Sequence, residues 1–298
     1  MKALYLIDAS GFIFRAFYAL PPLTRADGTP VGAVYGFCST LIKLRDVILK
    51  HSPYATVLWA SVFDVSRQTF RNDLFPAYKA NRKETPPELA PQFALIREAC
   101  PAFGCPVREV PGFEADDVIA SYVIQAQARG IPVVVVSSDK DLMQLKAPGV
   151  ELYDPMKARW VEEADVTAKF GVEPARVPDV QALAGDPTDG VPGVPGIGLK
   201  TAAELIRQFG TLEALLSGAQ ALPQKRRREL LLQHAEAART SYQLVTLRKD
   251  VPIEWDEASL AFPALLSQEA KDRGAAFCER QGFSVLKRRL QGPAPASA

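Results

Sequence analysis

Short apolar runs alternate with segments of helical periodicity over the first half of the chain. Continuous apolar runs at residues 3–7, 56–63 and 131–136 predict strands that are buried on both faces. Two shorter strand candidates lie at residues 106–110 and 150–153. Segments with helical spacing separate these runs, at residues 10–18, 32–50 and 87–100. This alternation predicts an α/β domain whose mainly parallel sheet is covered by helices on both faces.

The pattern changes beyond about residue 163, where we expect no further strand for roughly the next hundred residues. Residues 179–184 have a helical pattern, and a glycine- and proline-rich turn at residues 185–198 leads into another helix. With 298 residues, 48% of them hydrophobic, the chain can bury one sizeable core and a smaller domain. The Pro- and Ala-rich tail, residues 292–298, is expected to be disordered.

Carboxylates follow the three buried strands at the point where each strand ends. Asp8 ends the first run, Asp64 follows the second, and Asp139 and Asp141 follow the third. A single acid of this kind is more simply explained as a turn former. Because the carboxyl ends of parallel strands meet at one edge of an open sheet, the repetition favours a shared binding site.

Three more acids lie in the stretch V-P-G-F-E-A-D-D-V, at a predicted helix start. Glu114 and Asp117 are three residues apart on one face, and Asp116 lies to the side of that face. Acids in a first helical turn can simply complement the helix dipole. A further pair, Asp186 and Asp189, stands beside the glycine-rich turn. So many carboxylates at element ends indicate a shared cation site.

The cation is expected to have oxygen ligands. The chain has only two histidines, His51 and His234, and its four cysteines form no C-x-x-C pair. A soft-metal site is therefore disfavoured, and Mg²⁺ or Mn²⁺ is the expected ion.

The overall charge of the chain and its lack of a recognisable targeting signal say little about its function. The formal net charge of +1 does not indicate a nucleic-acid partner. The N-terminus reaches Asp8 too soon for a signal peptide, and no apolar run approaches the ~18 residues of a membrane span. The sequence predicts a soluble, cytoplasmic protein with no membrane association.

A local basic and aromatic segment, residues 69–87, follows the second strand. It contains basic residues interleaved with aromatic ones: Phe70, Arg71, Phe75, Tyr78, Lys79, Arg82 and Lys83. Cations neutralise phosphates and aromatic rings stack on bases, so this composition favours contact with a nucleic acid. The alternative is a solvated loop, but the position directly after Asp64 favours the functional interpretation.

The glycine-rich turn supplies a second candidate contact with a nucleic acid. Gly196 and Gly198 form a tight turn that enters a helix at Lys200 and Thr201, where free backbone N–H groups suit a phosphate. It is not a P-loop, because Leu199 separates the second glycine from the lysine. The alternative is an interhelix turn that needs glycine only for a positive φ.

Six segments in order carry a family resemblance: L-I-D-A-S-G-F-I-F-R-A-F-Y-A, F-D-V-S-R-Q-T-F-R, Y-K-A-N-R, G-F-E-A-D-D-V-I-A, S-S-D-K-D-L-M-Q-L and G-D-P-T-D-G-V-P-G-V-P-G-I-G-L-K-T-A. Together they resemble the bacterial 5′-nuclease family, which comprises the 5′→3′ exonuclease domain of DNA polymerase I and free-standing flap endonucleases. The resemblance runs from residue 4 to about residue 247.

The resemblance implies a monomer with a PIN-like catalytic domain at residues 1–172, an H3TH (helix-hairpin-helix) DNA-binding domain at 173–260 and a C-terminal extension at 261–298. It also implies a nuclease that hydrolyses phosphodiester bonds at DNA 5′ ends or flaps, including RNA primers on DNA. Two or more Mg²⁺ or Mn²⁺ ions are implied, and a K⁺ at the glycine turn.

The implied site residues follow by motif position. The implied metal ligands are Asp8, Asp64, Glu114, Asp116, Asp117, Asp139, Asp141, Asp186 and Asp189. The implied DNA contacts are Arg71, Tyr78, Lys79, Arg82, Gly196, Gly198, Lys200 and Thr201. The implied catalytic residues are Lys79, Arg82, Asp116 and Asp117.

Three positions depart from the family pattern, namely Val65, the Ser137-Ser138 pair and Gly190. None removes a carboxylate, so they affect loop geometry and not the acid set. We assign no protein nucleophile, because both histidines lie outside every motif. Two alternatives remain: a non-catalytic DNA-structure-binding module, and a PIN-type ribonuclease that acts on RNA alone. The intact acids argue against the first, and the glycine turn argues against the second.

Overall fold

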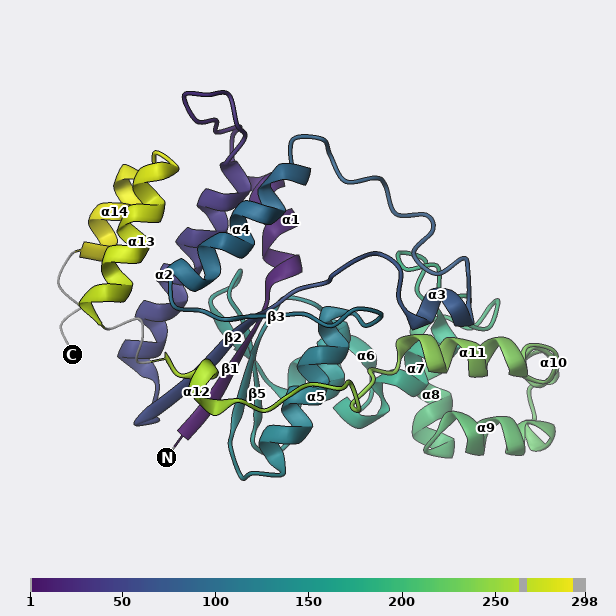
Figure 1. Ribbon diagram of the computed structural model, residues 1–298. Coiled ribbons are helices and arrows are strands. Elements are labelled where there is room, and N and C mark those ends of the chain that lie inside the picture. Colours follow the sequence, from purple (N-terminus) through teal and green to yellow (C-terminus); the bar gives the residue numbers. More distant parts are fainter. Residues whose placement is uncertain (1, 263–266, 292–298) are drawn as a thin grey trace.

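The computed structural model describes residues 2–262 and 267–291, and a six-stranded sheet forms its centre (Figure 1). The strands lie in the order β3-β2-β1-β4-β5-β6. Their bounds are β1 Lys2–Asp8, β2 Thr56–Val62, β3 Val107–Arg108, β4 Val133–Val136, β5 Val150–Asp154 and β6 Arg159–Val161. All neighbouring strands are parallel except β6, which pairs antiparallel with β5. The predicted strands and the mainly parallel sheet are confirmed, whereas the sequence pattern does not predict β6.

The helices fill the connections between strands and then dominate the second half of the chain. In chain order they are α1 Ala9–Ala19, α2 Gly32–His51, α3 Phe70–Leu74, α4 Ala90–Ala102, α5 Ala115–Gln127, α6 Glu163–Phe170, α7 Val177–Ala184, α8 Leu199–Phe209, α9 Leu212–Gly218, α10 Lys225–Gln233, α11 Ala235–Val245, α12 Glu257–Leu260, α13 Gln268–Arg280 and α14 Ser284–Gln291. Short 3-10 helices lie at Asp141–Leu145, Pro174–Arg176 and Ala219–Ala221.

The strand order places the switch point of the sheet between β1 and β4. The chain passes outward through β1, β2 and β3, and then returns to add β4 on the other side of β1. At such a point the two following connections leave in opposite directions, and the carboxyl ends of the strands open a crevice between them. Asp8 ends β1 at this edge, and Ser137 follows β4 directly.

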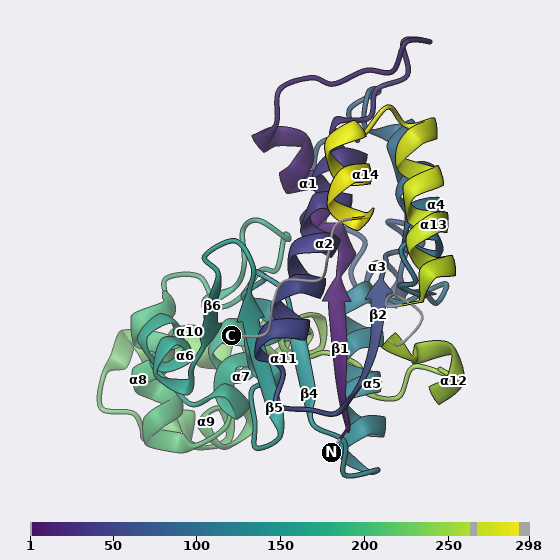
Figure 2. The same cartoon turned by 90° about the vertical axis from the view of Figure 1, so that its left-hand side faces the viewer.

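Helices cover both faces of the sheet, as the sequence predicts. Alternate residues of β1 point to opposite faces, so Tyr5 and Ile7 join one apolar cluster and Leu4 and Leu6 join the other. Buried residues of α1, α2 and α4 belong to the first cluster, and those of α5 belong to the second (Figures 1 and 2). The two faces are therefore filled by separate parts of the chain.

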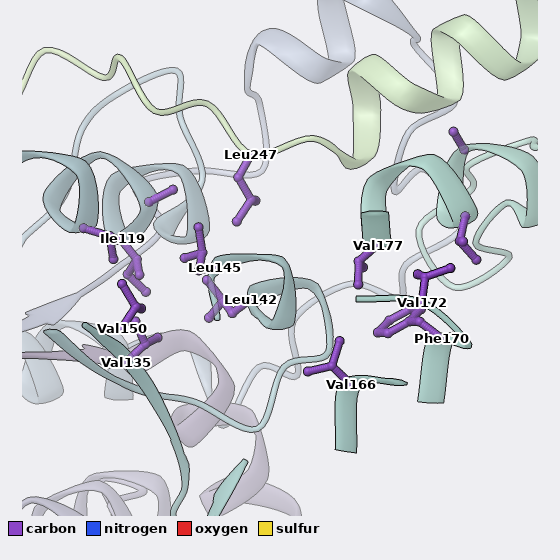
Figure 3. Close-up of a cluster of buried hydrophobic side chains, with 14 of the residues drawn as sticks. Ile119, Val135, Leu142, Leu145, Val150, Val166, Phe170, Val172, Val177 and Leu247 are labelled. Atoms are coloured by element: carbon purple, nitrogen blue, oxygen red, sulfur yellow. The ribbon is translucent and has the colours of Figure 1, made fainter. Parts of the chain in front are cut away.

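Helices α6 to α11 form a smaller helical domain beside the sheet (Figure 1). Its core is continuous with the core on the α5 face of the sheet, since Val166, Phe170 and Val177 fall in one apolar cluster with Ile119 and Val135 (Figure 3). Continuous burial of this kind fixes two domains relative to each other far better than a flexible linker does. The loop between α7 and α8 is thereby held against the sheet edge.

The C-terminal extension returns to the first domain. After α11 the chain crosses α5 as an irregular segment, residues 246–256, and reaches α12 (Figure 1). α13 and α14 then pack against α4 and α2, and the rings of Phe277 and Phe103 lie 6.1 Å apart. Buried residues of this helix pair complete the apolar cluster on the α2 face. The expected disorder of residues 292–298 falls outside the described residues.

Within the described ranges, 2–262 and 267–291, there is no helix whose length and apolar character would let it cross a membrane.

Candidate active site

The first group of carboxylates lies at the carboxyl edge of the sheet, where the sequence places the ends of the strands. Asp8 ends β1, Asp64 lies just beyond β2, and Asp139 and Asp141 follow β4. The side chain of Ser137 bridges the switch point, because its Oγ donates to Asp8 Oδ2 at 2.7 Å. The acids from neighbouring strands thus meet in one crevice, as expected.

The acidic helix α5 brings its N-terminus to the same edge. The backbone N–H of Ala115 donates to Asp64 Oδ1 at 2.8 Å, which ties the helix start to the end of β2. Glu114 is the N-cap residue, and Asp116 lies in the first turn. A helix N-terminus stabilises nearby negative charge, so the helix dipole supports these acids without explaining why the acids of the strands also gather there.

The second group of carboxylates comes from the helical domain. Asp186 and Asp189 lie in the loop between α7 and α8, which is closed by a backbone hydrogen bond from Val191 N to Asp186 O at 2.9 Å. The loop packs closely on residues 77–79: a Cβ added at Gly190 would lie 2.9 Å from Ala77 O. The glycine at this position is therefore required by the contact between the two domains.

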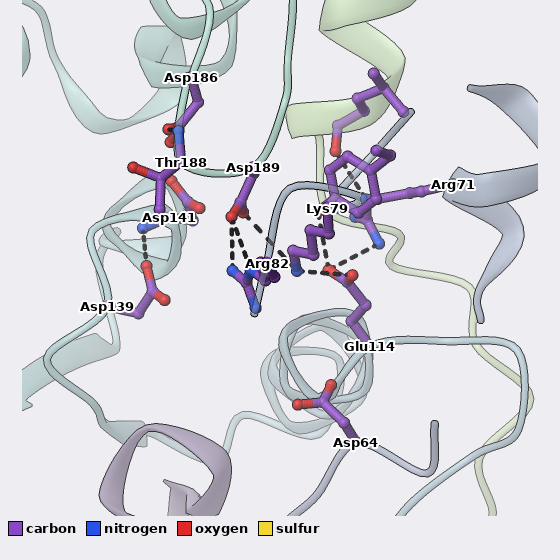
Figure 4. A network of polar contacts seen from close by, with 12 residues as sticks. Asp64, Arg71, Lys79, Arg82, Glu114, Asp139, Asp141, Asp186, Thr188 and Asp189 are labelled. Carbon is purple, nitrogen blue, oxygen red and sulfur yellow. Dashed lines mark hydrogen bonds and ion pairs between the residues drawn. The ribbon is translucent and has the colours of Figure 1, made fainter. Parts of the chain in front are cut away.

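Acids from both groups line one cavity of about 30 Å³. Its acidic lining residues are Glu114, Asp116, Asp139, Asp141, Asp186 and Asp189. Figure 4 shows the labelled acids of the sheet edge, of α5 and of the α7–α8 loop facing the same space. The acid cluster is therefore divided between two domains.

Burial and mutual repulsion raise the pKa of several of these carboxyls. Burial, with Asp139 and Asp64 nearby, raises the pKa of Asp8 to about 6, and burial beside Asp139 raises that of Asp141 to about 6. Burial and the charges of Asp139, Asp8 and Glu114 raise the pKa of Asp116 well above its usual range. Fully ionised, the cluster requires compensating positive charge.

Basic side chains supply part of that charge. Lys79 Nζ lies 2.7 Å from Glu114 Oε1, and Arg82 donates to Asp189 Oδ1 at 2.6 Å. Lys140, a residue that the sequence interpretation did not select, pairs with Asp186. Burial raises the pKa of Asp186 but Lys140 lowers it, and the net shift is downward.

The backbone of Lys79 is strained where it meets the helical domain. Its φ of 55° lies in the left-handed region, which side chains other than glycine rarely adopt. Its N–H donates to Asp189 O at 2.8 Å, and this bond holds the conformation. Tyr78, immediately before it, is buried and donates to Glu114 Oε2 at 3.2 Å. Strain of this kind is maintained by surrounding contacts and concentrates at functional sites.

Arg71 and Asp117 are placed differently from the sequence expectation. Arg71 is 1% exposed and Asp117 is fully buried. The two form a bidentate ion pair, with N–O distances of 2.6 and 2.8 Å. Asp117 also accepts N–H groups from Glu114 and Arg248, so its oxygens are already used. This geometry disfavours the DNA contact expected of Arg71 and the cation ligand expected at Asp117.

The sequence interpretation did not select two further residues, Gln181 and Ser137, as site residues. Gln181 of α7 donates to Asp141 Oδ1 at 2.6 Å, which fixes that carboxylate across the domain boundary. Ser137 holds Asp8, as described above, and also accepts the N–H of Asp139 at 2.9 Å. A serine and a glutamine of a helix carry no sequence signal by themselves; only the fold brings them to the acids.

The donor set suits a hard divalent cation. The cavity is lined by carboxylate oxygens, and no His or Cys is among its lining residues. Burial and mutual repulsion raise the pKa of several of these carboxyls, and such an ion would favour their charged forms. Among the described residues, no three His, Cys, Asp or Glu side chains converge closely enough to enclose one ion, and Lys79, Arg82 and Lys140 each pair with an acid of the cluster.

The glycine turn lies at the start of α8, on the outer side of the helical domain. Gly185 and Gly193 are required by packing, since a Cβ added at Gly193 would lie 2.4 Å from the N atom of Gly185. Gly196 needs its positive φ of 82°. Gly198 differs: its φ of −87° suits any residue, and a Cβ there would meet nothing within 4 Å. The fold does not explain the glycine at this position.

The arrangement of the sheet and the helical domain is similar to that of solved structures of other proteins. A structure described as divalent metal ions (zinc) bound to T5 5'-exonuclease aligns with a TM-score of 0.67 at 20% identity, over 94% of this chain and 99% of that chain. The catalytic core of Rad2 in complex with DNA substrate aligns with a TM-score of 0.57 at 17% identity, over 96% and 90%. The chain therefore shares the fold of these two proteins.

Matches to family models assign the chain to a family, which the structural matches alone do not. The N-terminal resolvase-like domain of 5'-3' exonucleases matches residues 3–171, and their C-terminal SAM fold matches residues 172–267. The chain belongs to the 5'-3' exonuclease family. The 5'-3' exonuclease of Aquifex aeolicus is 39% identical over 260 residues, which is 87% of this chain and 86% of that protein.

Longer relatives carry the same region. DNA polymerase I of Rhizobium leguminosarum is 50% identical over 96% of this chain and 28% of the relative, and that of Bacillus caldotenax is 37% identical over 98% and 33%. The chain thus spans about a third or less of the length of these polymerases.

Proposed function

We propose that this chain hydrolyses phosphodiester bonds at the 5′ ends and 5′ flaps of DNA, including RNA primers paired to DNA. The observation that carries the proposal is the acid cluster, which two domains build together at the switch point of the sheet. A fold and family assignment alone would not establish chemistry. The acids supply the chemistry, and the exposed glycine turn supplies a separate place to hold a duplex.

The proposed cation ligands are the acids that face the shared crevice. They are Asp8, Asp64, Glu114, Asp116, Asp139, Asp141, Asp186 and Asp189. Asp117 is left out of the set because its oxygens are committed to Arg71 and to backbone N–H groups. Two Mg²⁺ or Mn²⁺ ions bound there would activate water and stabilise the charge that develops on the phosphate.

The basic residues at the cavity bind the DNA strand. Lys79 and Arg82 each pair with an acid in the cluster, so their positive ends stand beside the place where a scissile phosphate would lie. Lys79 stabilises the negative charge of that phosphate. Tyr78 is 5% exposed, so it positions Lys79 and Glu114 and does not stack on a base.

The duplex portion of the substrate binds the turn of α8. Gly196, Gly198 and Lys200 are exposed and Thr201 is partly exposed, so backbone N–H groups and a lysine are available to a phosphate. The open space beside Gly198 supports close approach of a DNA backbone. We include in the proposal a K⁺ ion held by carbonyls of this turn.

The substrate class is tested with three labelled oligonucleotides in Mg²⁺: a 5′-flap DNA, a single-stranded DNA and a single-stranded RNA. We expect cleavage of the flap near its junction, with a 3′-hydroxyl on the released flap and a 5′-phosphate on the downstream strand that stays in the duplex. Binding of the flap without cleavage would identify a non-catalytic DNA-binding module. Preferential cleavage of the RNA would identify a ribonuclease.

Replacing Gly198 with valine is expected to weaken binding of duplex DNA while leaving the fold intact. Its extended backbone accepts a β-branched residue, and the added atoms project into open space where DNA approaches. Gly198→Ala should give a smaller loss in the same direction. Flap affinity is compared with cleavage of a short single strand, which should be less affected. Equal losses on both substrates would make the turn purely structural.

A further inference from the structure

The buried pair Arg71–Asp117 joins the two domains that contribute the acids. Arg71 lies in α3 and Asp117 in the first turn of α5, both in the catalytic domain. Each residue also forms a hydrogen bond with the backbone near the end of α11. Arg71 Nε donates to Leu244 O at 2.7 Å, and Asp117 Oδ1 accepts from Arg248 N at 2.8 Å. A charged pair with both partners so fully buried is otherwise costly.

The contact continues along one face of α5. Ser121 lies one turn after Asp117, and its Oγ accepts the N–H of Val251 at 3.0 Å. Gln125 lies one turn further and donates to Ile253 O at 3.1 Å. Asp117, Ser121 and Gln125 therefore form a row at four-residue spacing that holds the segment 246–253 (Figure 1). We call this row and Arg71 the α5 clamp.

The clamp connects the catalytic domain to the loop that carries Asp186 and Asp189. α11, at whose end the clamped segment begins, packs against α7, and that loop follows α7 directly. Gln144 adds a second tie, since its amide donates to Val245 O at 3.0 Å and accepts Leu247 N at 3.2 Å. Movement at the clamp would thus shift Asp186 and Asp189 relative to Glu114 and Asp116.

We propose that Arg71 and Asp117 are positioning residues that set the register between the duplex-binding turn and the catalytic acids, and thereby the position of the cut. The inference rests on the proposed nuclease function. The ion pairs Lys140–Asp186 and Arg82–Asp189 also cross the domain boundary, but their basic partners are partly exposed, so solvent screens these pairs more. The fully buried bidentate pair, with its backbone bonds, adds a rigid connection to the one that the shared apolar core provides.

The test removes both charges and keeps the hydrogen-bonding groups. Arg71→Gln combined with Asp117→Asn avoids the unpaired buried charge that either single change would leave. Ser121→Ala with Gln125→Ala is the second variant, because it loosens the same segment without altering any acid. Asp116→Asn is the control for loss of a cation ligand.

Interdomain order is measured with spin labels at Gln127→Cys on α5 and Gln208→Cys on α8, both exposed positions. All four native cysteines are buried, so labelling is restricted to the introduced sites. Both clamp variants should broaden the interspin distance distribution. Their Mn²⁺ affinity should fall by less than that of Asp116→Asn, and their affinity for flap DNA should stay within about twofold of wild type. Single-turnover cleavage should fall by about tenfold or more, with products spread over neighbouring positions.

A distance distribution and cleavage pattern equal to wild type in the charge-free variant would overturn the proposal. So would a loss of Mn²⁺ affinity as large as in Asp116→Asn, which would make Asp117 a cation ligand. A wild-type chain that cuts no flap would instead refute the proposed function, and the distance measurement would still decide whether the clamp orders the domains.

Discussion

Asp116→Asn is expected to reduce flap cleavage about a hundredfold or more while leaving DNA affinity intact. Asparagine keeps the size of the side chain and removes a charge from the centre of the acid cluster. The raised pKa of Asp116, caused by burial and by Asp139, Asp8 and Glu114, shows how strongly the other acids surround it. Because DNA is an anion, removing a negative charge should leave its binding unchanged or slightly tighter.

Lys79→Ala provides the contrast. Its ammonium group pairs with Glu114 and lies 3.8 Å from Asp189, so its loss should lower cleavage and also weaken the hold on the single strand. Flap affinity is measured in Ca²⁺, and single-turnover cleavage in Mg²⁺, for both variants. The expected pattern is a loss of rate alone for Asp116→Asn and a loss of both quantities for Lys79→Ala.

Asp165→Asn is the matched control. Asp165 is an acid in the first turn of α6, where it caps the helix through Glu162 N and lies outside the acid cluster. It should cut flap DNA at the wild-type rate. If Asp116→Asn also cut at that rate, the acids of α5 would serve only to cap their helix.

The sheet was predictable because its strands are encoded locally. Four-residue or longer runs of β-branched and aliphatic residues, such as Val133–Val136, need burial on both faces, and only a helix-covered parallel sheet provides it. β6 escaped prediction because three residues, Arg159–Val161, give too little periodicity to distinguish a strand from a turn. Its pairing is determined by the hairpin with β5 instead.

The convergence of the acids was predictable for a similar reason. Once the strands are parallel, acids at their carboxyl ends must share an edge, whatever the details of the helices. The roles of Arg71 and Asp117 were not predictable. Helical spacing places Asp117 on the same face as Glu114, but only the fold brings Arg71 against it and buries both. The local sequence predicts which face of a helix a side chain lies on, but it does not predict which residue from a distant part of the chain will contact that side chain.

The C-terminal helices illustrate the same limit. Residues 261–298 were expected only as an extension, yet Phe262 packs on Trp59 at 4.9 Å and Phe283 on Tyr35 at 5.3 Å. The amphipathic pattern of α13 and α14 shows that they need a partner surface. It does not reveal that the surface is α2 and α4, which lie far earlier in the chain.

Removal of divalent cations is expected to abolish cleavage completely. Excess EDTA should stop the reaction, added Mg²⁺ or Mn²⁺ should restore it, and a zinc-selective chelator should have no effect, because no His or Cys lines the cavity. Initial rates on flap DNA are measured under each condition. Full cleavage in excess EDTA would exclude the cation-dependent mechanism.

The same cations are expected to change how stability depends on pH. The folded-state pKa of Asp8 is about 6, above its ordinary 3.8, so the folded chain holds this proton more tightly than the unfolded chain does. Protonated Asp8 therefore contributes about 3 kcal/mol to the free energy of unfolding. This contribution is fully present below pH 4 and is lost as pH rises through 6. In EDTA, the Tm should therefore fall between pH 5 and pH 7.5. An acid with a lowered pKa, such as Asp186, behaves in the opposite way: its ionised form contributes to the free energy of unfolding, and this contribution is lost only as pH falls through its folded-state pKa.

Divalent cations should reverse this loss where the acids are ionised. At pH 7.5, Mg²⁺ at a hundred times its Kd adds about 2.7 kcal/mol to the free energy of unfolding, which for a chain of this size raises Tm by roughly 4 °C. At pH 5 the gain should be smaller, because protons already neutralise Asp8 and Asp141, whose pKa values are both about 6. Asp116→Asn should reduce the gain at pH 7.5. A Tm in EDTA that rises from pH 5 to pH 7.5, or a cation effect independent of pH, would show that the raised carboxyl pKa values do not govern cation binding.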